Sequence, residues 1–359
     1  MRVQPPRVHS AGVVELFSGI DSLYLSARVA PAPRALLADL ERLKSTATES
    51  RIPAQIDLGP ASFEVASAGF GRYRYRLDHP YGILGATDSQ SLPTFRIQPR
   101  AAFLHAVGPV LAIKWWSEVL DSVASEVRLT ASRLDVCADF HGLDFTPEER
   151  DYFLCPSPAR DEYTRATLSG WVWGAPGAMQ RARAYDKVAD AKKKGADWVE
   201  ALWGSQFDRG RSVWRVEAQC KREVLVEYGI DTAEDAIELA PRVYRSVFTK
   251  YLTLRVPSGD SNRSRWPLDP RWIEVSEPSF GFGALGLDRV RGGRRTGELR
   301  KVMPLIVGGL STAATVLDAR LSDVCGPALM AHVVKYGDTV GKPFEQRCAE
   351  KAAQIERTT

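Results

Sequence analysis

Residues 180–187 (QRARAYDK) alternate between alanine and side chains that are mostly charged or phenolic. In an extended strand, Arg181, Arg183, Tyr185 and Lys187 therefore share one face, and the alanines lie on the other. Three cations around one phenol are an unusual cover for a core, but they suit phosphodiester chemistry. Arginine and lysine bind phosphates and lower the pKa of a phenol beside them. A tyrosine placed in this way can attack phosphorus and hold the cut strand as a phosphotyrosine ester.

Two further segments alternate in the same manner and add carboxylates. Their polar faces carry Arg133, Asp135 and Asp139 in residues 130–139, and Arg215, Glu217 and Lys221 in residues 212–221. Side by side, the three strands would bring these carboxylates close to Tyr185. Carboxylates without histidine or cysteine favour a hard divalent cation, here Mg²⁺ or Mn²⁺. Asp135, Asp139 and Glu217 are thus the candidate metal ligands, and the ion would neutralise charge on a phosphate in the transition state.

The remaining cations are candidates for DNA contacts. They are Arg133, Arg181, Arg215 and Lys221 on the three strands, and Arg291, Arg294 and Arg295 in a later segment. That segment, residues 281–297, is rich in glycine and is predicted to form a basic loop, which contacts DNA or is simply solvated. The run Phe70–Arg76 interleaves arginine with tyrosine. It indicates either a DNA-contacting face or an exposed hairpin.

Each residue of the predicted site also has a purely structural interpretation. Tyr185 could anchor a strand at an interface without reacting. Asp135 and Asp139 could pair with Arg133 or Arg183 in a network of surface charges.

The same choice applies to two residues beside them. Glu217 could simply form an ion pair with Arg215, since ion pairs are common on the faces of sheets. His141 follows Asp139 closely, but no second histidine lies two residues away, so a paired-histidine metal motif is absent. We therefore predict a strand-end position for His141 rather than a ligand.

The elements that must position these residues follow from the hydrophobic periodicity. Strands are predicted at residues 21–29, 94–98, 130–139, 167–173, 178–187 and 212–221, with several short strands separated by turns within 56–77. Helices are predicted at 33–44, 101–123, 188–203 and 232–252, and residues 146–149 open a short helix. A turn at residues 174–177 (GAPG) makes a hairpin of the strands on either side. The long helix at 101–123 is predicted to bury Phe103, Leu104, Val107, Val110, Leu111 and Trp115.

Composition describes a globular protein with one large domain or two ordinary ones. The chain has 359 residues, of which 44% are hydrophobic and 26% charged. A net charge of +4 and a pI near 8.7 permit a nucleic-acid partner without requiring one. The five cysteines are odd in number and scattered, which favours reduced thiols and a cytoplasmic location. No apolar run predicts a signal or a membrane span.

Three motifs, taken in order, resemble one family. The motifs lie within about residues 125–230, and a weaker match lies at Phe95–Pro99. In order, they are Arg133-Leu134-Asp135 with Asp139, then Arg183-Ala184-Tyr185-Asp186-Lys187, then Trp214-Arg215-Val216-Glu217 with Lys221-Arg222-Glu223. The segment is similar to rolling-circle plasmid replication initiators of the Rep_trans type. Relaxases of some integrative conjugative elements belong to the same group. Each motif is short, and their order makes the resemblance specific.

The resemblance implies an α+β fold, in which helices cover an antiparallel sheet related to the palm of histidine-dependent nicking enzymes. It implies that Tyr185 is the nicking tyrosine, and that Asp135, Asp139 and Glu217 bind or support a metal ion. The family cuts one strand at an origin, stays joined to the 5′ phosphate and leaves a 3′ hydroxyl for a polymerase. A second transesterification closes the displaced circle. Host helicase and polymerase are therefore the implied partners.

Two departures from the family pattern fall near the site. Gln98 stands where family members carry an acid in an Arg-Ile-Glu-Phe-like strand. The Gly-Ser-Arg-like turn before the tyrosine strand is replaced by residues 173–176 (WGAP). The resemblance implies phosphate contacts from that turn, and this chain lacks the residues for them. Residues beyond about 256 match no family motif.

The predicted organisation is a catalytic domain at residues 1–256, a linker with the basic loop at 257–297, and a helical region at 298–359. Our first hypothesis is an enzyme that nicks and rejoins origin DNA, single-stranded or extruded as a hairpin or cruciform, as an initiator or a relaxase. Its rival binds origin DNA without cutting. A third possibility is a nuclease that uses metal-activated water. One nucleophile must serve two transesterifications, so we also predict a homodimer.

Overall fold

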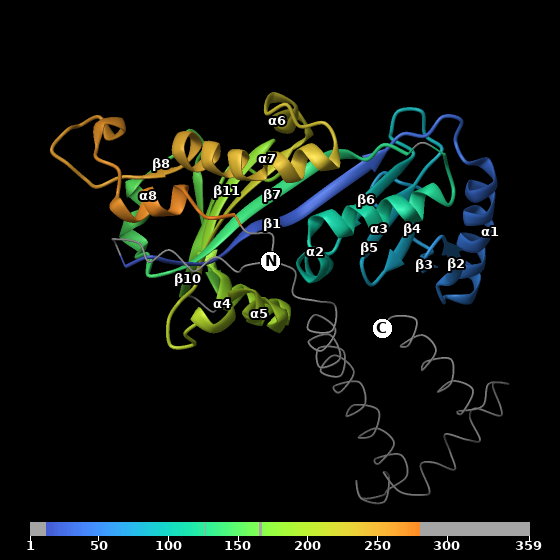
Figure 1. The fold of residues 1–359 in the computed structure, drawn as a ribbon, viewed down its shortest axis with the longest axis horizontal. Coiled ribbons are helices and arrows are strands. Elements are labelled where there is room, and N and C mark those ends of the chain that lie inside the picture. The colour runs from blue at the N-terminus through green and yellow to red at the C-terminus, as the bar shows by residue number, and fades with distance from the viewer. Residues whose placement is uncertain (1–11, 126, 165–166, 281–359) are drawn as a thin grey trace, which may run out of the picture. The chain divides into compact units, whose positions relative to one another are not determined.

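An eleven-stranded sheet, paired antiparallel at every recorded step, organises the described residues (Figure 1). In spatial order the strands are β2 (Ala54–Leu58), β3 (Ala61–Val65), β4 (Tyr75–His79), β5 (Gly82–Ala86), β6 (Phe95–Pro99), β1 (Val14–Ala27), β7 (Thr130–His141), β12 (Trp214–Lys221), β11 (Gln180–Asp186), β10 (Thr167–Trp173) and β9 (Ala159–Thr164). β8 (Phe153–Leu154) and β13 (Thr253–Leu254) form a separate pair. With its helices, this sheet confirms the predicted α+β class.

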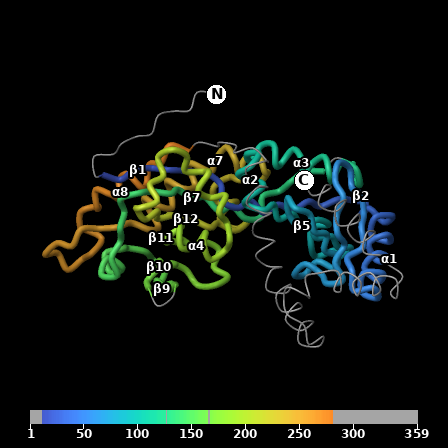
Figure 2. Tube along the Cα trace, turned by 90° about the horizontal axis from the view of Figure 1, so that it is seen from below, coloured from blue at the N-terminus to red at the C-terminus, as the bar shows by residue number. Residues whose placement is uncertain are grey.

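The computed structural model describes residues 12–125, 127–164 and 167–280. All of them belong to the first of two compact units, residues 1–289 and 290–359. The predicted helical region at 298–359 lies outside the described residues. Figure 2 shows that β9 and β2, the two ends of the sheet, lie at opposite sides of the first unit.

The helices of this unit lie on either side of the sheet. They are α1 (Arg34–Ser50), α2 (Ala101–Val107), α3 (Pro109–Asp121), α4 (Lys187–Lys194), α5 (Glu200–Trp203), α6 (Arg222–Glu227), α7 (Ala233–Ser246) and α8 (Pro270–Ser276). In Figure 1, α6 and α7 lie above the central strands, and α4 and α5 lie below them. Short 3-10 turns at Pro147–Tyr152, Asp197–Val199, Gly204–Gln206 and Arg263–Arg265, and a π turn at Val247–Tyr251, complete the elements.

One face of the central strands forms the main core, because alternate residues on these strands are apolar. Leu134, Val136 and Ala138 of β7 are fully buried in one cluster with Val243 of α7 and Phe248. Burial of each larger aliphatic or aromatic side chain contributes about 1.5–3 kcal/mol. The predicted alternation of 130–139, 178–187 and 212–221 is confirmed, and it leaves charged side chains on the opposite face, here named the polar face.

The segment that contains α4 and α5 covers one end of the polar face, and we call residues 187–207 the cap. Trp203 and Val199 of the cap form a second small core with Val213, and Phe17 of β1 packs against it. The cap was predicted as one helix. It is broken at Gly195, which ends α4 in the left-handed conformation (φ 62°) that favours glycine.

The predicted helix 101–123 is also two helices, α2 and α3, which meet at Gly108 (φ 81°). The break changes the rotational phase of α3. Val110 and Leu111, predicted to be buried, are 63% and 57% exposed, and Ala112, Ile113 and Trp116 face the core instead. A uniform 3.6-residue period cannot detect such a change of phase, so this prediction was wrong for α3.

Residues 257–280, predicted to lie in a linker, contain α8 and pack on the main core. Trp272 of α8 is fully buried and donates its indole N–H to the Phe248 carbonyl at 2.9 Å. Cys137, Cys155 and Cys220 are free thiols, as expected. No helix in the described ranges is long and apolar enough to cross a bilayer.

Candidate active site on the polar face

The three predicted strands are direct neighbours in the order β7, β12, β11. Their register places Arg183 opposite Glu217, and Tyr185 opposite Arg215. Arg215 in turn lies opposite Asp139 of β7. Residues that are far apart in the sequence are therefore adjacent on the polar face, as the alternation predicted.

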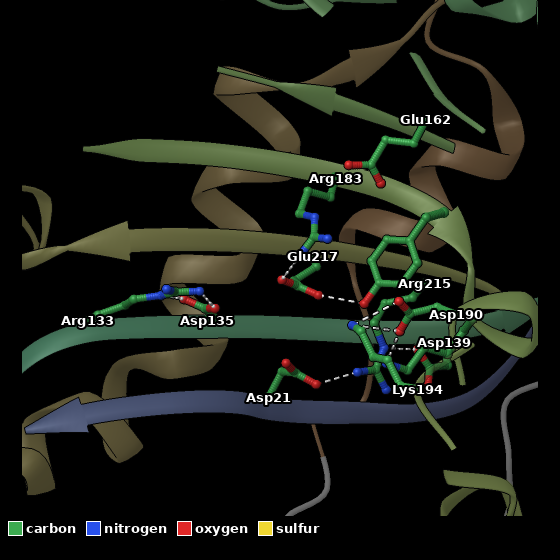
Figure 3. Close-up of polar contacts among 12 residues, drawn as sticks. Asp21, Arg133, Asp135, Asp139, Glu162, Arg183, Asp190, Lys194, Arg215 and Glu217 are labelled. Carbon is green, nitrogen blue, oxygen red and sulfur yellow. Dashed lines mark hydrogen bonds and ion pairs between the residues drawn. The ribbon is translucent and has the colours of Figure 1, made fainter. Parts of the chain in front are cut away.

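Tyr185 and Glu217 form the centre of the site. The Tyr185 hydroxyl donates a hydrogen bond of 2.8 Å to Glu217 Oε2, and Arg183 Nη1 donates one of 3.1 Å to Glu217 Oε1 (Figure 3). Both oxygens of this carboxylate are thus occupied. Tyr185 is only 5% exposed and Glu217 only 2%. A phenol bonded to a buried carboxylate is the arrangement of a nucleophile and its general base.

The electrostatics of Tyr185 differ from the prediction. Burial, followed by the charge of Glu217, raises the pKa of Tyr185 well above 10. Arg183 and Lys187 do lie over the ring, at 4.9 and 5.5 Å from its centroid. Arg215 and Arg183 lower the pKa, but burial outweighs them. The expectation that nearby cations give Tyr185 a low pKa was therefore wrong, and the phenol needs a base to react.

A glycine on the adjacent strand makes room for this tyrosine. Gly170 of β10 lies opposite Tyr185, and a Cβ built on it would lie 2.6 Å from Tyr185 Cβ and 2.5 Å from the Ala184 carbonyl oxygen. No real Cβ tolerates such contacts. Sequence reasoning passed over Gly170, although a glycine inside a strand often marks a close approach.

Lys187 is the first residue of α4 rather than the last of the strand. Asp186 caps this helix by accepting a hydrogen bond from the Ala189 backbone N–H. The Lys187 ammonium is nearly buried and forms an ion pair of 3.2 Å with Asp190. Lys187 therefore faces the Tyr185 ring, but its charge is already balanced.

Asp135 is held by its own strand. Arg133 binds it with two hydrogen bonds, of which Nε to Oδ1 is 2.7 Å. The carboxylate is 2% exposed and the guanidinium 27%. Burial raises the pKa of Asp135 to about 7, against the lowering effect of Arg133. The structural alternative for Asp135, a pair with Arg133, is the one observed.

A buried ionic cluster lies beneath the cap. Arg215 binds both oxygens of Asp139, at 2.6 and 2.7 Å, and also contacts Asp21 of β1. Trp203 of the cap donates its indole N–H to Asp139 at 2.8 Å. Burial opposes ionisation of Asp21, but Arg215 and His105 hold its pKa well below 3.8.

Sequence reasoning missed Asp21 and Trp203, because neither lies within a family-like motif. Arg215 was predicted to contact DNA, but it is 1% exposed and its guanidinium is used by two carboxylates. Arg215 is therefore a structural residue that holds Asp139 and Asp21 together.

The three predicted metal ligands do not fit a divalent ion in this arrangement. Each carboxylate has its own donors: Arg133 for Asp135, Arg215 and Trp203 for Asp139, and Arg183 and Tyr185 for Glu217. Within the described ranges, no three Asp, Glu, His or Cys side chains gather as a metal site. An ion would have to displace a guanidinium or phenol from each carboxylate, so the metal requirement stays a prediction.

The cations predicted to contact DNA lie in different environments. Arg181 is partly buried, and burial followed by the charges of Arg183, Arg160 and Arg133 lowers its pKa. The Nε atoms of Arg181 and Arg183 have no hydrogen-bond partner among the described residues. Lys221 Nζ binds the Gly177 carbonyl at 2.5 Å. The predicted cations of the basic loop, Arg291, Arg294 and Arg295, lie outside the described residues.

His141 ends β7, as predicted. Its Nδ1 lies 2.7 Å from the Ser212 carbonyl, and its Nε2 accepts a hydrogen bond of 3.1 Å from the Asp208 backbone N–H. Both ring nitrogens are therefore engaged. His141 fixes the loop before β12 rather than binding a ligand.

Comparison with known proteins adds a distant likeness in fold. No family model matches this chain, and no curated protein matches it. Among solved structures, a rolling circle replication initiator protein from Geobacillus stearothermophilus is similar with a TM-score of 0.45 and 15% identity. The alignment covers 74% of this chain and 96% of that one. A likeness at this level transfers no residue roles.

Proposed function

We propose that this protein initiates rolling-circle DNA replication by nicking one strand of origin DNA with Tyr185 and later rejoining it. The observation that carries the proposal is the bond of 2.8 Å between the Tyr185 hydroxyl and buried Glu217, beside Arg183. The order of the Arg133, Tyr185 and Glu217 motifs supports the same assignment. A relaxase of a conjugative element would use the same chemistry and is included in the proposal.

In the nicking step, the Tyr185 oxygen attacks phosphorus and its proton passes to Glu217. The bond between phosphorus and the 3′ oxygen breaks, and that oxygen takes a proton from solvent. The products are a 5′-phosphotyrosine ester and a free 3′ hydroxyl. Arg183 contributes a fixed positive charge beside the reacting atoms, which stabilises the phosphorane-like transition state. Rejoining is the reverse sequence, with Glu217 returning the proton.

A base is required because burial keeps the phenol protonated at neutral pH. Proton transfer to a positioned carboxylate contributes roughly 10²–10⁴-fold in rate. Divalent metal dependence is a separate prediction, and no step here passes through a metal. A denaturing-gel assay for the protein–DNA adduct, run with Mg²⁺, with Mn²⁺ and with a chelator, tests this prediction.

Burial of Tyr185 favours a second candidate, a protein of the same fold that binds origin DNA without cutting it. At 5% exposure, Tyr185 must become more accessible before a phosphate can reach it. The two candidates differ in one product, the covalent adduct. Both place single-stranded or hairpin DNA on the polar face.

The test uses purified protein and labelled single-stranded oligonucleotides that tile the origin region of its own replicon. Denaturing gels are read for a protein–DNA adduct, with Tyr185→Phe as the matched variant. An adduct that is lost in Tyr185→Phe supports the proposal. Binding without an adduct on any tile supports the non-cutting candidate. Cutting that survives in Tyr185→Phe assigns the nucleophile to another group.

Replication needs two transesterifications and the site offers one tyrosine, so we also propose that a second protomer takes part. Light scattering of the protein with and without origin DNA measures this. Closed circles produced by a strictly monomeric protein would contradict it. Host helicase and polymerase remain the proposed partners for elongation.

A further inference from the structure

Four side chains on the polar face, away from Tyr185, form an alternating stack of rings and cations. The Arg96 guanidinium lies 4.8 Å from the centroid of the Phe70 ring and 5.8 Å from that of Tyr24. Arg133 lies over the same Tyr24 ring, at 4.7 Å. The order is therefore aromatic, cation, aromatic, cation. We name these four residues the ring–cation stack.

The sheet register builds this stack from successive strands. Arg96 is on β6, Tyr24 is on β1 and Arg133 is on β7, which are neighbours in that order. Tyr24 lies directly opposite Arg133 in the register, so both side chains lie on the polar face that carries Asp135. The stack is thus continuous with the surface that leads to Tyr185.

Phe70 reaches the stack from the connection between β3 and β4. A tight turn holds it, with hydrogen bonds of 3.0 Å in each direction between the backbones of Phe70 and Tyr73. Its ring lies over Gly85 of β5, where an added Cβ would be 3.0 Å from Phe70 Cδ1. Gly85 pairs with Arg96 in the register. The glycine therefore gives the ring its place beside Arg96.

The charges of the stack are not balanced equally. Arg133 is paired with buried Asp135. Arg96 makes no ion pair within the part of the chain that the structure describes. The two rings and Arg96 are half-buried, so part of each side chain remains exposed to solvent. A bare cation between two rings is a site for an anion that also carries a flat apolar group.

We propose that Phe70, Arg96, Tyr24 and Arg133 form a binding subsite for single-stranded DNA, in which the cations contact phosphates and the rings stack on bases. The proposal rests on the proposed function for the identity of the strand. Duplex DNA fits poorly, because its bases are already stacked on one another. Aromatic rings and arginine together are the usual means of holding an unpaired strand.

The geometry also indicates where the bound strand runs. Tyr185 and Asp139 are at the same level of the register, and Arg133 is six residues along β7 from Asp139, about 20 Å at the rise of a strand. Arg181 and Arg183 lie between, and the charge of Arg181 interacts with those of Arg183 and Arg133. The subsite therefore holds DNA several nucleotides from the nick, which makes it a positioning site rather than a catalytic one.

Fluorescence anisotropy tests the subsite with the full-length protein and a labelled single-stranded oligonucleotide of mixed sequence, over a range of salt concentrations. Arg96→Ala is expected to weaken binding about tenfold and to reduce the slope of log K against log salt by about 0.7, the value for one phosphate on a single strand. Phe70→Ala is expected to weaken binding by a similar factor with no change in slope. Arg42→Ala is the matched control, because Arg42 is 68% exposed on α1.

Arg96→Lys keeps the charge but loses the planar group, so it should retain the salt slope and lose affinity. This variant answers the question if Arg96→Ala does not fold. The proposal is overturned if Arg96→Ala binds like Arg42→Ala in both affinity and slope. It is also overturned if Phe70→Ala changes the slope as much as Arg96→Ala does.

The adduct assay separates this proposal from the proposed function. Binding that depends on Arg96, in a protein that never forms an adduct, supports the subsite and contradicts nicking. An adduct in the wild type, with Arg96 and Phe70 variants that bind like the control, supports nicking and contradicts the subsite. Tyr185→Phe should bind the oligonucleotide like the wild type in either case.

Discussion

Two arginine–carboxylate groups on the polar face differ in which partner reaches solvent. At the open end, the Arg183 guanidinium is 26% exposed above a Glu217 carboxylate that is 2% exposed. Beneath the cap, Arg215 and Asp139 are 1% and 0% exposed. Both groups pair a guanidinium with a carboxylate. The first leaves part of its guanidinium exposed to solvent, and the second buries both charges. The depth of the guanidinium, rather than its presence on the face, decides whether a phosphate can use it.

The largest effect should come from removing each arginine in turn. Arg215→Ala leaves Asp139 buried without its main partner, which typically costs about 3–5 kcal/mol of folding free energy. Arg183→Ala should cost less, about 1–3 kcal/mol, because Tyr185 still donates to Glu217. Urea unfolding of both variants measures the difference. Equal losses would mean that burial does not distinguish the two groups.

Arg183→Ala should nevertheless lose the covalent adduct, because it removes the charge beside the reacting atoms. Any Arg215→Ala protein that still folds should retain more adduct formation than Arg183→Ala. The reverse order would place the catalytic charge beneath the cap. Gel quantification of the adduct, normalised to folded protein, decides between them.

Replacing Glu217 tests whether this carboxylate is the general base for Tyr185. Glu217→Gln keeps an acceptor for the Tyr185 hydroxyl but not a base, so adduct formation should fall roughly 10²–10⁴-fold. The residual rate should rise with pH, because burial holds the pKa of Tyr185 well above 10 and only the ionised phenol reacts. Rates measured from pH 6 to 10 test this. A variant as fast as the wild type would remove Glu217 from the reaction.

The strands of this site were predictable because side-chain alternation is a local property. The alternation of residues 130–139, 178–187 and 212–221 located all three strands and separated their two faces. Alternation could not determine which residues lie opposite one another on neighbouring strands. The structural alternative for Glu217 was an ion pair with Arg215, but the register places Glu217 opposite Arg183, and Arg215 opposite Asp139. Register depends on contacts between distant segments, which no local pattern records.

Features that depend on contacts between distant segments could not be predicted for the same reason. Asp21 joins the site only because β1 lies next to β7, more than a hundred residues later in the chain. The exposure of Val110 was mispredicted because Gly108 breaks the helix before it. The raised pKa of Tyr185 depends on burial, and burial is known only once the cap is in place. Residue types alone therefore did not predict the burial, the charge partners or the pKa of the candidate site residues.

A smaller effect should follow from filling the space beside Tyr185. In Gly170→Ala, the new Cβ would contact Tyr185 Cβ and the Ala184 carbonyl, so Tyr185 must move or β10 must shift. Overpacking of this kind costs about 1–3 kcal/mol, and displacement of Tyr185 from Glu217 should reduce adduct formation. Gly259→Ala is the matched control, because nothing lies within 4 Å of its added Cβ. A fully active Gly170→Ala would show that the position of Tyr185 is not fixed by β10.

The last effect concerns the pH dependence of folding at the Arg133–Asp135 pair. Burial raises the folded-state pKa of Asp135 from its ordinary 3.8 to about 7. A carboxyl with a raised pKa contributes stability that is present below its unfolded pKa and is lost as pH rises through the folded value. The stability of the wild type relative to Asp135→Asn should therefore fall between pH 4 and about 7 and stay level above it. A rise of about three pKa units corresponds to at most about 4 kcal/mol, so the thermal midpoint should fall by several degrees over this range. Glu223→Gln, at an exposed carboxylate, should show no such fall. A stability difference between wild type and Asp135→Asn that stays constant with pH would mean that Arg133 keeps Asp135 ionised throughout. Asp135 would then resemble Asp139 beneath the cap, a buried carboxylate paired with an arginine.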